Sequence, residues 1–318
     1  MASLGRGPLD IQDYGAAGQV LDAPAILARL PELAEVADVF PVPFSAVIST
    51  RIGFTEWRAL ARECDRLVAA EPDLAGIVIG HGTSSLEETA YALSLTLKVA
   101  VPVVMVGAQR PASALSSDMG MNLLNAVRVA ASPEARGLGV LVLLNDEIHA
   151  ARDVAKTSTW RLQTFRTPDF GVLGHADGDR IAFYRRPMRR VAPETEFDIR
   201  GLPALPRVDI AYSHADADGT AIRAFMAAGS QGIVSAGFAP GAGTPAEVEA
   251  LRQAAEAGVV VVQSTRVGSG RVVLGQRMAR EGFLSADNLT PQKARILLAL
   301  ALTVTRDPAE IIRIFESY

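Results

Sequence analysis

The sequence predicts an α/β protein with a larger N-terminal parallel-sheet domain and a smaller C-terminal α/β domain joined by a linker. Short apolar runs alternate with longer amphipathic segments along most of the chain, as strands and helices do in parallel sheets. A stretch over residues 184–206 breaks this alternation with four prolines and a cluster of charges, which is typical of a linker. We therefore expect an N-terminal domain over residues 1–188, a linker over 189–206 and a C-terminal domain over 207–318.

The expected strands are short runs of valine, isoleucine and leucine, and the expected helices are the amphipathic segments between them. Two further helices close the chain, each with a proline at its start, where proline is well tolerated. The N-terminal strands are expected at 43–49, 75–81, 101–107 and 138–144, with helices at 55–70, 85–98 and 119–131. The C-terminal strands are expected at 208–212, 231–237 and 258–264, and the closing helices begin near Pro291 and Pro308.

Composition excludes several classes of protein. With 318 residues, 49% of them hydrophobic, the chain can bury one or two substantial cores. A net charge of -4 offers no electrostatic reason to bind nucleic acid or an anionic membrane. No apolar run reaches the roughly 18–20 residues of a membrane helix, and residues 1–20 lack a basic region followed by an apolar one. We expect a cytoplasmic protein.

Cysteine and histidine usage gives no support to a disulfide framework or a metal site. The one cysteine, Cys64, lies in a helical pattern, where we expect a buried and inert thiol. The four histidines are widely spaced and form no metal-binding motif, so we expect neither a metal nor a cofactor. These histidines are His81, His149, His175 and His214.

The polar residues that follow the predicted strands are the candidates for a site, because open parallel sheets bind ligands at the carboxyl ends of their strands. The segment HGTSSLEETAY begins at His81. One interpretation is structural: Ser84 or Ser85 caps the next helix and Glu87 or Glu88 completes a capping box, with Ser85 and Glu88 the favoured pair. That role does not account for Gly82 and Thr83. A glycine there lets backbone N–H groups face an anion or carbonyl, and a threonine hydroxyl can act as a nucleophile or position water.

The candidate base is Lys156, in the segment RDVAKTSTWRLQTF. Lysine occurs only three times, at Lys98, Lys156 and Lys293, in a chain otherwise rich in arginine. A lysine that is partly desolvated falls in pKa and can relay a proton, whereas an arginine cannot be deprotonated. Taken by itself, this segment favours a solvated surface lysine over a base.

Together these motifs resemble the bacterial L-asparaginase/glutaminase family. The segments HGTSSLEETAY, VPVVMVGAQRP, LNDEIHAARDVAKTST, TFRTPDFGVLG and PQKARILLALALT occur in order, and the resemblance extends from about Ser3 to Tyr318. It implies an amidohydrolase that converts L-asparagine or a related small amide into the acid and ammonia. It also implies a homotetramer, built as a dimer of dimers, with active sites at the interface of paired subunits.

The resemblance assigns roles to residues at matching positions. Thr83 matches the threonine that orients or activates the attacking water, and Lys156 matches the lysine of the family's threonine–lysine–aspartate group. Ser49 matches the serine that binds the α-carboxylate of the substrate. Tyr14 falls near the catalytic tyrosine of a flexible loop that activates the nucleophile and covers the substrate. Contacts with the substrate are expected from Ser49, Thr50, Gly82 and Ser84.

This chain departs from the family pattern at three places. The family begins with a strand that ends in Thr-Gly-Gly-Thr-Ile, whereas this chain begins MASLGRGPLDIQDYG; we expect a late start rather than a natural deletion. Ser84 stands where the family has an aspartate that contacts the α-ammonium of the substrate. The asparagine and glutamate that the partner subunit supplies in the family are not evident at 240–247 or 268–276. We therefore expect a shifted substrate or weak asparaginase activity.

Two other functions stay open from the sequence. A binding protein could keep the pocket and release no ammonia. A nucleotide-binding protein is the other alternative, since residues 238–247 form a glycine-rich turn between a strand and a helix. That turn lacks the lysine and hydroxyl of a phosphate-binding loop and the spacing of a dinucleotide site. We expect it to be structural.

Overall fold

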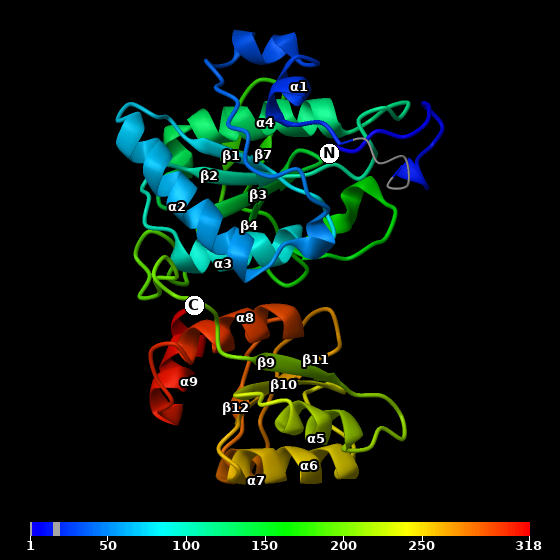
Figure 1. The fold of residues 1–318 in the computed structure, drawn as a ribbon, viewed down its shortest axis with the longest axis vertical. Coiled ribbons are helices and arrows are strands. Elements are labelled where there is room, and N and C mark those ends of the chain that lie inside the picture. The colour runs from blue at the N-terminus through cyan, green and yellow to red at the C-terminus, as the bar shows by residue number, and fades with distance from the viewer. Residues whose placement is uncertain (1, 15–19) are drawn as a thin grey trace. The chain divides into compact units, whose positions relative to one another are not determined.

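The computed structural model describes residues 2–14 and 20–318, and the chain divides into two compact units between Thr195 and Glu196 (Figure 1). Each unit holds its own sheet with helices on both faces, so the predicted α/β class is confirmed. Among the described residues, no helix is both long and apolar enough to cross a membrane.

The first unit is built on a six-stranded mixed sheet with the strand order β1-β2-β3-β4-β7-β8. Its first three strands are parallel and the last three run antiparallel to their neighbours. The change of direction occurs at Asn145 and Asp146, whose φ angles of 52° and 66° form a two-residue hairpin turn. The strands are β1 (Ile77–Gly80), β2 (Val103–Val106), β3 (Val140–Leu144), β4 (Glu147–Ala150), β7 (Gly174–Ala176) and β8 (Ile181–Phe183).

The helices of this unit cover both faces of the sheet (Figure 1). One face is covered by α4, and α3 lies on the other with α2 packed outside it. The Trp57 indole donates a hydrogen bond of 3.0 Å to Thr89 and thereby joins α2 to α3. Cys64 is buried in α2, as predicted. The remaining elements are α1 (Ala23–Leu27), α2 (Phe54–Ala70), α3 (Leu86–Thr96), α4 (Met119–Ala131) and the strand pair β5 (Ala155–Lys156) and β6 (Phe165–Arg166).

The strand predicted at residues 43–49 is wrong. This segment is irregular up to Ile48 and then enters a short 3-10 turn over Ser49–Arg51. A strand needs a hydrogen-bonded neighbour, and within the described residues this segment has none, while β1 lies at the edge of the sheet. The apolar side chains of Phe44, Val47 and Ile48 are consequently exposed.

The second unit is a parallel four-stranded sheet with the order β12-β11-β10-β9. Helix α8 packs on one face, while α5 and α6 pack together beside the other face around Ile222, Ile233 and Leu251. The strands and the two proline-initiated helices predicted here are confirmed. The elements are β9 (Val208–Tyr212), α5 (Thr220–Ala227), β10 (Gly232–Gly237), α6 (Pro245–Glu256), β11 (Val260–Thr265), α7 (Gln276–Arg280), β12 (Leu284–Ser285), α8 (Pro291–Ala301) and α9 (Pro308–Ser317).

Candidate active site

The loop His81–Ser85 leaves the carboxyl end of β1 and leads directly into α3. The backbone N–H of His81 donates to the carbonyl of Val106 at 2.8 Å, which extends the pairing of β1 with β2 by one residue. The loop therefore begins at the edge of the sheet where parallel strands present their ligands. The N-terminus of α3 adds a partial positive charge at the same place.

Gly82 lies against Ser49 so closely that no side chain fits between them. A Cβ at position 82 would lie 2.6 Å from the hydroxyl oxygen of Ser49 and 2.8 Å from its Cβ. Ser49 is buried, and its carbonyl accepts a hydrogen bond of 2.6 Å from the Ser85 hydroxyl. The Ser85 side chain makes no capping bond to α3. The capping box predicted from Ser85 and Glu88 is therefore wrong, because the Ser85 hydroxyl anchors the Ser49 segment instead.

Thr83 and Lys156 form the central contact of the site. The Lys156 ammonium donates a hydrogen bond of 2.8 Å to the Thr83 hydroxyl across 73 residues of sequence. Both side chains are half-buried. Burial lowers the pKa of Lys156 below the ordinary lysine value, while the nearby Glu87 carboxylate acts to raise it. Partial desolvation thus favours a lysine that can exchange its proton.

Glu87 is a residue of this site that the sequence did not single out. Its carboxylate accepts a hydrogen bond of 3.0 Å from the backbone N–H of Lys156, and its side chain is buried on the first turn of α3. The acidic pair Glu87–Glu88 after a loop serine suggested helix capping, so only the three-dimensional fold reveals this contact.

His81 supports the loop through its imidazole ring. Its Nδ1 lies 2.7 Å from the carbonyl of Gly82, and since a carbonyl only accepts hydrogen bonds, Nδ1 carries the proton. Burial is the main cause that lowers the pKa of His81. Within the described part of the chain, Nε2 has no hydrogen-bond partner.

The remaining predicted site residues are Ser84, Thr50 and Tyr14, and the structure shows fewer contacts for them. Ser84 and Thr50 are exposed, and the Ser84 hydroxyl makes no hydrogen bond within the described residues. Tyr14 is half-buried and directly precedes residues 15–19, which are outside the described part. Among the residues that are described, no hydrogen bond joins Tyr14 to Thr83 or Lys156. The fold therefore brings Ser49, Gly82, Thr83 and Lys156 together, and the role of Tyr14 stays a prediction.

Asp118 is a second residue that the sequence analysis missed. Its carboxylate accepts hydrogen bonds of 2.9 Å from the backbone N–H groups of Gln109 and Arg110, and it also binds the Asn122 amide. This network holds the segment after β2, where a Cβ at Gly107 would lie 3.1 Å from the Thr83 methyl group. Asp118 thereby supports the wall beside Thr83.

The glycine-rich turn at residues 238–247 has a structural role, as expected. Thr244 accepts a hydrogen bond from the Glu247 backbone, and the Glu247 carboxylate accepts one from the Thr244 backbone. This reciprocal pair is a capping box that starts α6. The turn therefore forms the N-terminal cap of α6.

Comparison with known proteins now identifies the family. Residues 10–189 match the family model described as "Asparaginase, N-terminal", and residues 207–315 match the model "Glutaminase/Asparaginase C-terminal domain". The chain belongs to the bacterial L-asparaginase/glutaminase family. The resemblance drawn from the sequence motifs is confirmed, and the chain is an L-asparaginase-type amidohydrolase.

Individual relatives match this family member over nearly its whole length. It is 39% identical to the "Probable L-asparaginase periplasmic" of Haemophilus influenzae over 99% of this chain and 89% of that protein. It is 41% identical to "L-asparaginase 2" of Bacillus subtilis, over 94% of this chain and 79% of the relative. A crystal structure of a "Probable Cytoplasmic L-asparaginase" from Campylobacter jejuni has a TM-score of 0.94 and 37% identity, covering 100% of this chain and 96% of that one.

Proposed function

We propose that this amidohydrolase hydrolyses L-asparagine, or a closely related small linear amide, by proton transfer through Lys156 and Thr83. The observation that carries the proposal is the 2.8 Å contact between the Lys156 Nζ and the Thr83 hydroxyl at the end of β1. That distance lies within the range required of a base and the proton it removes. The contact joins the two residue types that the family resemblance assigns to catalysis.

The proposed reaction needs Lys156 in its neutral form. The amine then accepts the proton of the Thr83 hydroxyl, or of a water that Thr83 orients, while the oxygen attacks the amide carbon. As the carbon–nitrogen bond breaks, the Lys156 ammonium returns the proton to the departing nitrogen, which leaves as ammonia. Where water attacks, the acid is released directly. Where the Thr83 oxygen attacks, the product remains bound to it as an ester; a water then gives a proton to Lys156 and attacks the carbonyl carbon, the ester bond breaks, and Lys156 returns the proton to the Thr83 oxygen.

The substrate end of the site is assigned to the residues around Gly82. Ser49 is proposed to bind the α-carboxylate, with Thr50 and the backbone at Gly82 beside it, and the N-terminus of α3 favours a negative charge there. Ser84 is exposed beside Thr83 and can hydrogen-bond an α-ammonium. A charged hydrogen bond contributes about 1.5–3 kcal/mol and a neutral one about 0.5–1.5 kcal/mol. Recognition of an α-amino acid amide is therefore weaker by roughly tenfold or more than with an aspartate at this position.

Assembly and location are also proposals. The family resemblance supports a homotetramer arranged as a dimer of dimers, and light scattering on the purified protein tests it. We propose a cytoplasmic location, which agrees with the description of the Campylobacter jejuni relative, although the Haemophilus influenzae relative is described as periplasmic. Cell fractionation tests this second proposal.

The decisive experiment measures ammonia release from L-asparagine and L-glutamine by the wild-type chain and by its Lys156→Ala variant. Release that disappears in the variant supports the proposal. The same assay on a version extended upstream by a strand ending in Thr-Gly-Gly-Thr-Ile separates two roles of Thr83. Activity without the extension makes Thr83 the nucleophile, and activity only with it leaves Thr83 to orient water. If neither folded protein releases ammonia but both still bind substrate, the result indicates a binding protein.

A further inference from the structure

We propose that Glu87 is a positioning residue that holds Lys156 against Thr83 and supplies the negative charge beside its ammonium group. This inference rests on the proposed function, because it assigns a partner to the base of that mechanism. Nothing in the sequence pattern points to this role, since Glu87 lies 69 residues from Lys156.

The geometry ties Lys156 to α3 at two points. Glu87 accepts a hydrogen bond of 3.0 Å from the backbone N–H of Lys156. Thr83 lies just before the helix and accepts a hydrogen bond of 2.8 Å from the Lys156 ammonium. Strand β5 is two residues long and, within the described residues, pairs only with the equally short β6. The Glu87 bond therefore attaches a small element to a long and buried helix. Because Glu87 is buried, this charge-assisted bond is well shielded from water.

The ionisable groups around Lys156 come from several elements. Glu87 and Glu88 lie on α3, His81 precedes that helix, and Arg152, Asp153 and Arg166 flank β5. Arg152 pairs with Asp153, and Arg166 binds Gln163. Of all these groups, Glu87 is the one whose charge acts to raise the pKa of Lys156. With Ser84 in place of an aspartate, the loop itself contributes no carboxylate.

Substitutions can separate the two parts of this role. Glu87→Gln keeps a side-chain oxygen that can accept the Lys156 N–H but removes the charge. Glu87→Ala removes both, and Glu87→Asp keeps the charge on a shorter side chain. Glu88→Gln is the matched control, because it removes the same charge from the same turn of α3 without a hydrogen bond to the Lys156 backbone.

The experiment measures the pKa of Lys156 directly, by the pH dependence of trace acetylation read for each lysine by peptide mass spectrometry. The chain has only three lysines, so Lys98 serves as an internal reference. In Glu87→Gln, we expect Lys156 to titrate at lower pH than in the wild type, with Lys98 and the Glu88→Gln protein unchanged. This measurement is independent of whether the protein is catalytically active.

Kinetics give the second measurement on the same proteins. The acid limb of the pH profile of kcat/KM should move to lower pH in Glu87→Gln, because the lysine loses its proton more readily. Glu87→Ala should lose about 10- to 100-fold in kcat/KM through misplacement of the base. Glu87→Asp should restore the position of the limb.

The outcomes distinguish this inference from the proposed function. An unchanged titration of Lys156 in Glu87→Gln overturns the role of Glu87, whatever the activity. Full ammonia release by Lys156→Ala overturns the proposed function instead. A lower pKa of Lys156 in Glu87→Gln, together with the expected shift of the acid limb, supports both the role of Glu87 and the proposed function.

Discussion

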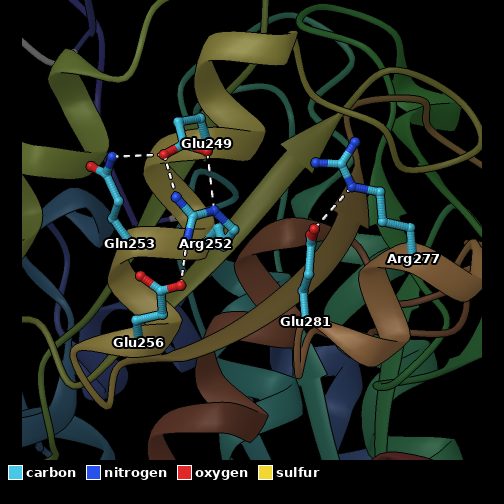
Figure 2. A network of polar contacts seen from close by, with 6 residues as sticks. All are labelled: Glu249, Arg252, Gln253, Glu256, Arg277 and Glu281. Atoms are coloured by element: carbon cyan, nitrogen blue, oxygen red, sulfur yellow. Dashed lines mark hydrogen bonds and ion pairs between the residues drawn. The ribbon is translucent and has the colours of Figure 1, made fainter.

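Charged side chains play different parts in two regions of this protein, the candidate active site and the surface of the second unit. At the candidate active site, Lys156 contacts Thr83 and Glu87 from a distant segment of the chain, and all three residues are at least half-buried. On α6, Arg252 binds Glu249 and Glu256 at the surface of the second unit (Figure 2). The hydrogen bond to Glu249 is the main cause that raises the pKa of Arg252. Solvent screening nevertheless makes such exposed pairs weak.

The surface group is local in sequence. Arg252 pairs three residues back and four residues ahead along one helix, Gln253 also binds Glu249, and Arg277 pairs with Glu281 four residues later. Figure 2 shows that each of these contacts lies along a single stretch of chain. The number of ion pairs in a group therefore does not measure its functional importance. In the proposed mechanism, a single partly buried contact between distant segments carries the chemistry, whereas the four local contacts lie along α6 and at the end of α7.

Replacement of Lys156 is expected to have the largest effect on activity. Lys156→Arg keeps the positive charge but cannot be deprotonated at accessible pH, so we expect kcat/KM for ammonia release to fall about 10²- to 10⁴-fold. Lys98→Arg is the control and should retain activity. An active Lys156→Arg protein would show that no proton passes through this residue.

The pH dependence of the wild type follows from the same lysine. The protonated form prevails below its pKa and cannot act as a base, so activity falls as pH falls through that value. Because burial lowers the pKa of Lys156, we expect this acid limb below the range of an ordinary lysine. A pH profile of kcat/KM measures it, and a limb at the ordinary lysine value would contradict the assignment.

Gly82→Ala should have the next largest effect. The new Cβ would lie 2.6 Å from the Ser49 hydroxyl oxygen, so either Ser49 or the loop must move. We expect a loss of about 10- to 100-fold in kcat/KM and a destabilisation of about 1–3 kcal/mol, measured by ammonia release and by urea unfolding. Gly201→Ala meets no atom within 4 Å and is the matched control. Equal behaviour of the two variants would refute the tight packing at Gly82.

Ser84→Asp tests whether charge limits substrate recognition. The added carboxylate can bind an α-ammonium, so we expect kcat/KM for L-asparagine to rise about tenfold. Ser84→Asn has nearly the same shape without the charge and should give little gain. If turnover of L-asparagine is the same in all three proteins, the serine does not explain any weakness of this site.

The smallest effect is expected from the surface group. Arg252→Ala removes contacts with Glu249 and Glu256, yet the melting temperature should change by no more than about 2 °C. Thr89→Val provides the buried comparison, because it leaves the Trp57 indole N–H without its acceptor at 3.0 Å and should cost about 1–3 kcal/mol. A larger loss of stability in Arg252→Ala than in Thr89→Val would show that the exposed ion pairs contribute more than the buried hydrogen bond.

Much of the fold was predictable because its elements are local patterns. The apolar runs at 101–107 and 138–144 form β2 and β3, and Pro291 and Pro308 start α8 and α9. The segment 43–49 has the same apolar character but no hydrogen-bonded strand beside it among the described residues. A strand depends on its neighbour, and a sequence pattern does not reveal whether that neighbour is present.

By itself, the sequence determined the α/β class, the family motifs and the candidates Thr83 and Lys156, because each depends on residue type and short spacing. Only the tertiary structure decided which of the two acidic residues at the start of α3 reaches Lys156, and that Ser85 binds Ser49 rather than capping its own helix. These contacts join segments separated by 69 and 36 residues. Their existence depends on how the sheet and helices pack, which local periodicity does not encode.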